Sequence, residues 1–548
     1  MNSFSFFNRK TISEELQTTE FDLLIIGGGI TGVGIALDAA SRGMKVALIE
    51  KNDFASGTSS KSTKLIHGGL RYLKQFDFWL VKEVGTERAI VHKLAPHLVI
   101  PEKMILPLIE GGTYGSWLTS IGLKVYDILA SVEGEDKRKM LNKKESLEME
   151  PLLPKKILHG AGYYAEYRTD DARLTIEVLK TALNYSTKAM NYVQATEFLY
   201  KDNRVVGATV LDNLSKEKFD IKAKYVVNAT GPWVDELRQI NHSKTGKRLH
   251  LTKGVHLVVA HEKLPVKQSV YFDVPDGRMM FAIPRGKTTY FGTTDTGFQL
   301  NKDNIEAHLV DATYLISAVN NMFPAVHLTM DDIQSSWAGL RPLIHEEGKS
   351  ASELSRKDEL FVSETELISI AGGKLTGYRK MAERIVDLVA KKYSRRFDKE
   401  FKDIQTEQIV LCGGSFKNFK AVKTYIKEVL KKLSPLGFQK TEATYLVYNY
   451  GRQTGLILKK FDELSGKDPK EKLIKAELWF TIQYEMVCTP TDFFMRRTGR
   501  LFFDKPSVDL YKNLILKECV AHFNWNEETT QKHQKELEEK MANAITFH

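Results

Sequence analysis

The sequence predicts an α/β protein with a mainly parallel sheet, a second, antiparallel sheet and an α-helical C-terminal region. Short apolar runs such as Phe21–Ile26 and Tyr225–Ala229 are typical of parallel strands that are buried on both faces. Runs that alternate in polarity, such as Val255–Val259 and Thr288–Gly292, are typical of antiparallel strands with one face turned to a ligand or to helices. From about residue 415 onward, apolar residues recur at helical spacing, which predicts successive helices.

Length and composition narrow the class of protein. A chain of 548 residues with 42% hydrophobic and 27% charged residues predicts two or three folded domains. Cys412, Cys488 and Cys519 lie far apart, so we expect neither a disulfide framework nor a metal site. No run approaches the roughly 18 uninterrupted apolar residues of a membrane span, and residues 1–20 lack the pattern of a secretory signal. We therefore expect a cytoplasmic protein.

The first strand runs directly into a glycine-rich turn. Phe21–Ile26 is followed by Gly27, Gly29 and Gly32 in the pattern G-x-G-x-x-G, and then by a helix, a capping Gly43 and a second strand. In such a Rossmann-like unit the first glycine permits the tight turn, the second lets the backbone approach a pyrophosphate, and the third allows close packing. The unit therefore predicts a dinucleotide site at the N-terminus of the helix.

Glu50 ends the second strand and is expected to accept hydrogen bonds from ribose hydroxyls. A carboxylate at this position disfavours a 2′-phosphate and leaves NAD and FAD as candidate cofactors. Thr58, Ser59 and Ser60 follow and offer hydroxyl donors for a second phosphate contact.

Two later turns are expected to reach the same cofactor. One follows the strand Tyr225–Ala229, and the other follows a strand over Leu367–Ala371 and opens a helix whose N-terminus can point at the cofactor. The residues expected to contact it are Gly231, Gly372, Gly373, Leu375 and Thr376.

A set of motifs runs densely from residue 20 to 392 and continues into the C-terminal region. It comprises Gly27–Gly32, Gly57–Ser60, Ser62–Leu73, Tyr167–Leu174, Asn228–Trp233, Lys253–His256, Gly292–Thr296, Gly339–Leu343, Gly372–Lys380, Thr489–Phe494 and Arg496–Arg500. In these motifs the chain resembles the flavin-dependent glycerol-3-phosphate dehydrogenases, a branch of the D-amino-acid-oxidase-like FAD proteins. The resemblance implies FAD as the cofactor and a fold of the glutathione-reductase type.

The resemblance also implies a domain division and a reaction. We expect an FAD-binding domain over residues 20–395, interleaved with substrate-binding parts at about 75–165 and 250–345, and an α-helical domain over residues 410–548. The implied reaction oxidises sn-glycerol 3-phosphate to dihydroxyacetone phosphate, by hydride transfer from C2 to FAD, and passes the electrons to a quinone.

Four residues match the positions that line the substrate site of that family: Arg71, Tyr72, Arg341 and Lys374. Arginine suits bidentate contacts to phosphate, and lysine suits a point-charge contact. The residues therefore predict a site for a small dianion.

The implied reaction also requires a base for the C2 hydroxyl proton. His67 and His256 are the two candidates, because a neutral imidazole has a usable pKa near physiological pH, and we favour His256. Arg341 and Lys374 are expected to take part in catalysis, with Lys374 and Thr376 facing the negative charge that builds on the flavin.

Other functions are open to the same residues. The flavin fold also supports an oxidase that releases hydrogen peroxide, an amine or amino-acid oxidase, and a module that only stores FAD. Three cations around one small site favour a phosphate dianion over an amine. The pI of about 9.0 could indicate nucleic acid, but no RNA-binding module or aromatic-basic stripe accompanies it, so we expect none.

The C-terminal region carries half of the net charge of +10, with 24 Lys and Arg against 19 Asp and Glu in residues 401–548. It could pack on the first domain, form a homodimer, or lie on the anionic inner face of the cell membrane through Lys431, Lys432, Lys459 and Lys460. Structural packing is the interpretation that we favour.

Overall fold

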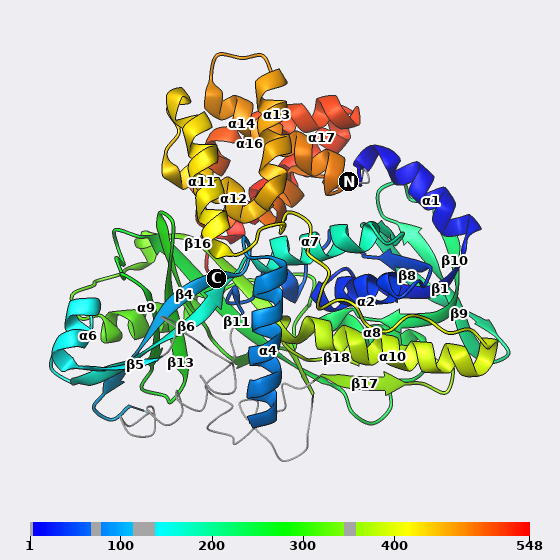
Figure 1. Ribbon diagram of the computed structural model, residues 1–548, viewed down its shortest axis with the longest axis horizontal. Helices are drawn as coiled ribbons and strands as arrows, with labels where there is room; N and C mark the ends of the chain where they lie inside the picture. The colour runs from blue at the N-terminus through cyan, green and yellow to red at the C-terminus, as the bar shows by residue number, and fades with distance from the viewer. Residues whose placement is uncertain (1–3, 67–77, 113–137, 345–357) are drawn as a thin grey trace.

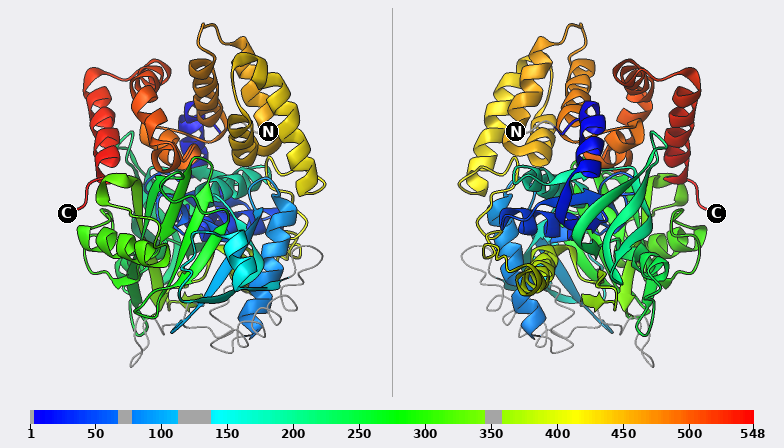
Figure 2. Two further views of the ribbon diagram at one scale, coloured as in Figure 1. Left: turned by 90° about the vertical axis from the view of Figure 1, so that its left-hand side faces the viewer. Right: turned by 90° about the vertical axis from the view of Figure 1, so that its right-hand side faces the viewer.

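The computed structural model describes residues 4–66, 78–112, 138–344 and 358–548, which form two sheets and a group of C-terminal helices. Sheet A lies to the right in Figure 1 and sheet B to the left, and the C-terminal helices, coloured yellow to red, lie above them. The side views in Figure 2 show the same arrangement, with the helices on one side of both sheets.

Sheet A is built around five parallel strands in the order β18, β10, β1, β2, β7. Antiparallel β17 closes one edge, and β8 and β9 extend the sheet from β10. The strands are β1 (Glu20–Ile26), β2 (Val46–Ile49), β7 (Lys188–Met190), β8 (Val193–Lys201), β9 (Arg204–Asp212), β10 (Lys218–Asn228), β17 (Glu359–Val362) and β18 (Ile368–Ala371).

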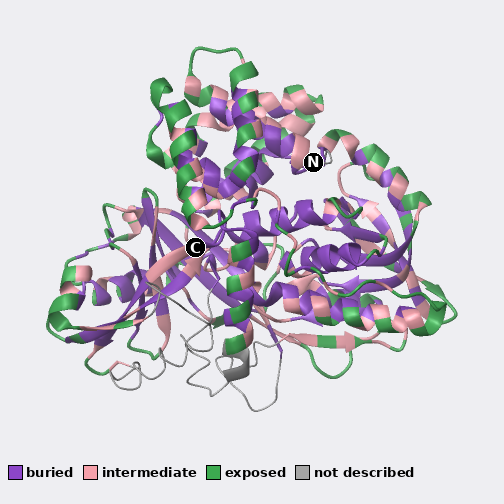
Figure 3. Ribbon diagram, in the orientation of Figure 1, coloured by how far each residue is buried: buried purple, intermediate pink, exposed green. Residues whose placement is uncertain are grey.

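The parallel strands are buried on both faces. Leu23 and Ile25 of β1 pack in one core with several helices, and Leu24 and Ile26 pack on the other side with β8, β9 and two helices. The helices of the first core include α2 (Ile30–Ser41), α7 (Asp171–Leu183) and α10 (Tyr378–Phe397), and one of the helices on the other side is α1 (Arg9–Thr18). The prediction from the continuous apolar runs is confirmed, and Figure 3 shows these strands as buried.

Sheet B is antiparallel except for one parallel pair, β4 with β12. Its longest pairing joins β11 to β16, and His256 of β11 lies opposite Trp337 on one side and Gly292 on the other. The strands are β3 (Leu65–Ile66), β4 (Ile100–Ile109), β5 (Lys139–Asn142), β6 (Leu158–Arg168), β11 (Leu249–Ala260), β12 (Ser269–Asp273), β13 (Met279–Arg285), β14 (Thr288–Gly292), β15 (Thr296–Gly297) and β16 (Ile333–Ile344).

Helices cover both faces of sheet B. On one face, Leu257 and Phe291 pack with α9 (Leu309–Met322). On the other, Tyr290 and Trp337 pack with residues of the C-terminal helices, including Phe502. The C-terminal region therefore packs on the first part of the chain. Its helices are α11 (Phe419–Leu433), α12 (Lys440–Tyr450), α13 (Thr454–Glu463), α14 (Pro469–Tyr484), α15 (Arg500–Phe503), α16 (Lys505–Phe523) and α17 (Glu527–Asn543).

The remaining helices of the described ranges are α4 (Phe78–Leu94), α6 (Lys143–Met149) and α8 (Val234–Ile240). In these ranges no helix combines the length and the apolar character that crossing a membrane requires.

Buried charges tie α7 to the end of α14. Arg173 donates to both carboxylate oxygens of Glu485, at 2.6 and 2.8 Å, and Lys180 donates to the same carboxylate at 2.9 Å. Glu177 accepts from Arg173 and Lys180 in turn. Burial alone would raise the pKa of Glu485, but Arg173 and Lys180 lower it to about 2. The Glu485 carboxylate is therefore ionised in the folded protein near neutral pH.

We expect Glu485→Gln to destabilise the protein by about 3–5 kcal/mol, because it leaves the two buried cations without full compensation. The pKa of Glu485 falls from 4.5 to about 2 on folding, so its contribution is present above pH 4.5 and is lost as pH falls toward 2. The deficit in thermal midpoint should therefore shrink between pH 7 and pH 3.

The control is Glu197→Gln, which breaks the exposed ion pair with Lys218. It should cost about 1 kcal/mol or less. Equal midpoints for the two variants at pH 7 would contradict the role of Glu485.

Candidate active site

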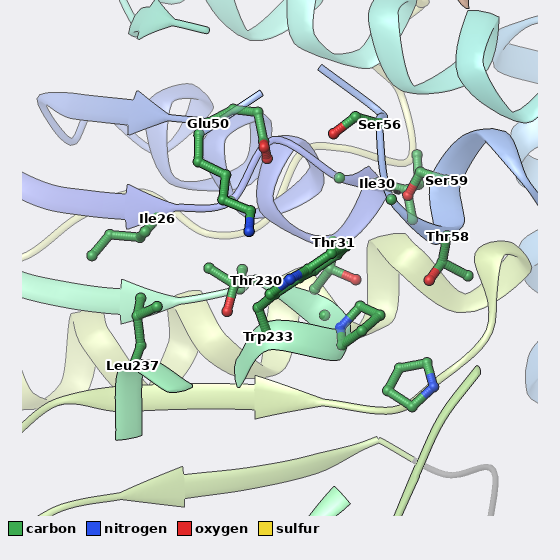
Figure 4. A pocket seen from close by; sticks show the side chains of 18 of the residues that line it. Ile26, Ile30, Thr31, Glu50, Ser56, Thr58, Ser59, Thr230, Trp233 and Leu237 are labelled. Carbon is green, nitrogen blue, oxygen red and sulfur yellow. Dashed lines mark hydrogen bonds between the residues drawn. The ribbon is translucent and has the colours of Figure 1, made fainter. Parts of the chain in front are cut away.

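A cavity opens at the carboxyl ends of β1, β2 and β10. Figure 4 shows side chains from separate segments around it, among them Glu50, Ser59, Thr58 and Trp233. In an open α/β sheet this edge is where nucleotides bind, because the N-termini of the following helices gather there.

The glycine turn after β1 leaves no room for side chains. Gly27 has φ +118°, and a Cβ added there would come 2.5 Å from the carbonyl oxygen of Ala229. A Cβ on Gly32 would overlap the Gly27 carbonyl, and one on Gly29 would lie 3.2 Å from Ser59 Oγ. Gly27 and Gly29 line the cavity, whereas Gly32 lies inside α2 and allows its close packing. This bare backbone at a helix N-terminus fits a pyrophosphate.

The carboxylate of Glu50 is fixed by two backbone amides. Its oxygens accept hydrogen bonds from Gly28 N at 2.7 Å and from Asn52 N at 2.9 Å. Burial raises the pKa of Glu50, against the lowering effect of these two bonds. The side chain lines the cavity beside the glycine turn, a position that fits contact with ribose hydroxyls.

The segment Gly57–Ser59 lines the cavity beside the glycine turn. Ser59 Oγ accepts from Ile30 N at 2.9 Å, and Thr58 Oγ1 donates to Leu340 O of β16 at 2.7 Å. Both residues line the cavity, but Ser60 does not. Its side chain is buried, and its carbonyl accepts from Lys64 Nζ at 3.0 Å, so the geometry does not favour the predicted cofactor contact by Ser60.

The two later glycine turns border the same cavity. Gly231, with φ +55°, and Gly372, with φ +80°, both line it. Lys374 and Leu375 line it as well, just before the start of α10, whereas Thr376 is buried behind them. The predicted cofactor residues Gly27, Gly29, Glu50, Thr58, Ser59, Gly231, Gly372, Gly373 and Leu375 are thus brought together around one cavity.

Arg341 of β16 precedes Pro342, which lines the cavity. Its guanidinium donates to Thr294 O at 3.0 Å, to Asp295 Oδ1 at 3.1 Å and to Thr293 Oγ1 at 2.9 Å. A Cβ on Gly254 would come 2.7 Å from the guanidinium carbon, so that glycine makes room for it. The arginine is therefore held in a fixed orientation, although it is not among the residues that line the cavity.

His256 is buried in sheet B and does not itself line the cavity. Its Nε2 lies 3.0 Å from Thr63 Oγ1, and its ring stacks on Trp337 with 4.9 Å between centroids. Burial lowers the pKa of His256 well below its usual value, and Arg341 and Lys64 lower it further. The imidazole is therefore neutral near pH 7. The other predicted site residues, His67, Arg71 and Tyr72, lie outside the residues that the structure describes.

Several parts of the cavity wall were missed by the sequence reasoning, and two of them are instructive. Trp233 lies two residues after Gly231, and an aromatic residue in this turn could have been predicted to line the cavity. The start of β8 reaches the cavity because the preceding strand, β7, pairs with β2; the lining residues there are Val193, Gln194 and Ala195. No local sequence pattern predicts that placement.

Comparison with known proteins agrees with this geometry. A family model described as FAD dependent oxidoreductase matches residues 22–376, and one described as the C-terminal domain of alpha-glycerophosphate oxidase matches residues 404–530. The chain is 49% identical over 547 residues to the aerobic glycerol-3-phosphate dehydrogenase of Bacillus subtilis, and the match covers 99% of each chain. It is 47% identical to the protein of that name from Staphylococcus aureus strain MRSA252, over 99% of this chain and 98% of the relative.

A solved structure resembles the whole chain. The glycerol-3-phosphate dehydrogenase from Bacillus halodurans, complexed with FAD, superimposes with a TM-score of 0.85 at 43% identity and covers 99% of each chain. The cavity, with its bare glycine turn, fixed carboxylate and hydroxyl donors, fits the cofactor of that complex. The chain therefore belongs to the FAD-dependent oxidoreductase family, in the branch of the aerobic glycerol-3-phosphate dehydrogenases.

Proposed function

We propose that the protein oxidises sn-glycerol 3-phosphate to dihydroxyacetone phosphate. The observation that carries this proposal is a cation in the lining of a cavity that fits a dinucleotide, Lys374. A second cation, Arg341, precedes the lining residue Pro342 in β16 and is held by Asp295 and two threonines. A fixed guanidinium and an ammonium suit a small dianion. The full-length likeness to proteins named for this activity supports the same substrate.

When bound, FAD supplies the acceptor for the hydride that leaves C2 of the substrate. Gly27, Gly29 and Ser59 would hold its pyrophosphate, and Glu50 its ribose hydroxyls. Lys374 and the free N–H groups that open the next helix would stabilise negative charge that develops at their end of the cavity.

His256 is the base that we favour for the C2 hydroxyl proton. The contact with Thr63 fixes the orientation of its ring. Burial outside the cavity lining and a pKa well below the usual value make this imidazole a weaker base than an ordinary histidine. His67 remains the alternative. Burial is the main cause of the lowered pKa of His256, and Arg341 lowers it further, so the imidazole is unprotonated before the substrate arrives.

The domain division remains part of the proposal: 20–395 for the FAD-binding domain, with substrate-binding parts at about 75–165 and 250–345, and 410–548 for the helical domain. Two observations support it. Strands β4 to β6 and β11 to β16 build sheet B, whereas the segment between them returns to sheet A through α7 and β7 to β10. The strand β3 precedes the first of these ranges.

We further propose a quinone as electron acceptor and a cytoplasmic protein that binds the inner face of the cell membrane peripherally. The names of the full-length relatives, dehydrogenases rather than oxidases, support the first part. Lys431, Lys432 and Lys459 are exposed on the helical region, and each such cation can add about 1 kcal/mol of attraction to anionic lipid.

Arg341→Met should lower kcat/KM for glycerol 3-phosphate by a factor that corresponds to about 2–5 kcal/mol, because a charged partner of the dianion is lost. FAD content should stay unchanged. Glycerol without its phosphate should hardly react with the wild-type protein. The control is Arg278→Met, an arginine in the turn between β12 and β13 that pairs with Asp276. Equal activity on glycerol and glycerol 3-phosphate would rule out the phosphate site.

His256→Gln should lower kcat by about 10²–10⁴-fold with FAD content preserved, because the proton acceptor is removed. His261→Gln is the matched control, since His261 also contacts a threonine hydroxyl of the sheet, at 2.9 Å. The lowered pKa leaves His256 neutral through pH 6.5, so its protonation should not reduce wild-type kcat between pH 8 and 6.5. A kcat within tenfold of wild type in His256→Gln would transfer the role to another group.

The acceptor is tested by steady-state turnover of glycerol 3-phosphate in air. We expect a quinone analogue to stimulate turnover strongly, little hydrogen peroxide to form, and high salt to release protein from anionic vesicles because it screens the attraction. Stoichiometric peroxide at full turnover, without stimulation by the quinone analogue, would instead identify an oxidase.

A further inference from the structure

The loop between Glu50 and Ser59 has a buried acid at its centre. Asp53 is 1% exposed and lies in a loop that carries cofactor residues at both ends. An ionised carboxylate without partners would be too costly at such a position, so its partners determine where the loop lies.

Those partners come from the C-terminal helical region. Arg496 Nε donates to Asp53 at 2.5 Å, and Arg497 donates to both of its oxygens at 2.7 and 2.8 Å. Asn191 Nδ2, at the turn between β7 and β8, adds a bond of 3.0 Å. Burial alone would raise the pKa of Asp53, but Arg497 and Arg496 lower it to about 2, so the acid is ionised at neutral pH.

The residues beside Asp53 contact the glycine turn directly. Ala55 N donates to Gly28 O at 3.0 Å, and the ring of Phe54 lies so close to Gly28 that a Cβ there would come within 2.7 Å of it. On the other side, Glu50 accepts from Gly28 N. The loop is thus bonded on both sides of Asp53 to the turn that would hold the pyrophosphate.

The two arginines are themselves fixed by the helical region. Arg496 donates to Asp492 at 2.6 Å, and Arg497 donates to the carbonyl of Glu485 at 2.8 Å. Asp492 also accepts from Tyr192 Oη at 2.7 Å, and Tyr192 N donates to Asn52 O at 2.8 Å. The two arginines that bind Asp53 are therefore held in place by their own hydrogen bonds to other groups.

We propose that Arg496 and Arg497 of the C-terminal helical region are positioning residues for FAD, which act by clamping Asp53 and so hold the loop Glu50–Ser59 in its cofactor-binding position. The clamp gives the helical region a part in cofactor retention, although it contributes no residue to the cavity wall described above. The inference rests on FAD binding and is independent of the identity of the substrate and of the base.

The test measures the dissociation constant of FAD by titrating apoprotein and following flavin fluorescence. Asp53→Asn and Arg497→Met should each raise this constant at least tenfold, and excess FAD should restore wild-type KM for glycerol 3-phosphate. Arg497→Lys keeps the charge but loses the bidentate contact, so it should give an intermediate dissociation constant. This milder variant keeps the test possible if the first two variants fail to fold.

The matched control is Arg500→Met. Arg500 is a neighbouring arginine of the same helical region that pairs with Glu477 at 2.9 Å and makes no described contact with the loop. It should lower the thermal midpoint of the apoprotein and leave the FAD constant within twofold of wild type. Gly29→Val serves as the reference for lost binding, since its side chain would intrude on the cavity beside Ser59. FAD constants within twofold of wild type in folded Asp53→Asn or Arg497→Lys would overturn the proposal.

Discussion

The structure depends on satisfying the polar groups of one largely half-buried segment, Gly57–Lys64, which crosses from the cavity of sheet A to the face of sheet B. Buried backbone carbonyls require donors. Sheet B supplies them: Trp337 Nε1 donates to Ser62 O at 3.1 Å, and Tyr290 Oη donates to Thr63 O at 3.1 Å. In a third bond the segment is the donor, because Thr58 Oγ1 donates to the carbonyl oxygen of Leu340 in sheet B. The segment that borders the cavity is thereby fixed to sheet B.

The same segment accounts for the electrostatics of the site. Lys64 is fully buried, pairs with Asp171 of α7, and lies over the ring of Trp337 at 5.5 Å. Its charge helps to keep His256 neutral. Burial is the main reason that His256 is neutral, and the ammonium group of the ion pair that fixes the segment adds to this effect.

The sequence predicted those structural features that depend on neighbouring residues in the chain. The first βαβ unit follows from apolar strands, glycine spacing and Gly43, which has φ +100° and follows α2 as expected. β10 begins seven residues before the predicted start at Tyr225, because its first half alternates in polarity and pairs with β9. The contacts of Asp53 and Arg173 could not be predicted, because each depends on residues that are distant in the sequence and carry no local signal.

The distance along the chain between Asp53 and Arg497 has a consequence for biosynthesis. The two residues are 444 positions apart, and a ribosome adds roughly 5–20 residues per second. Asp53 is therefore made roughly 20–90 s before its partner arginine exists. Glu485 likewise reaches Arg173 only after more than 300 further residues. The nascent nucleotide-binding half must wait through most of translation with these charges in water, and it reaches its final form only when nearly the whole polypeptide has been made.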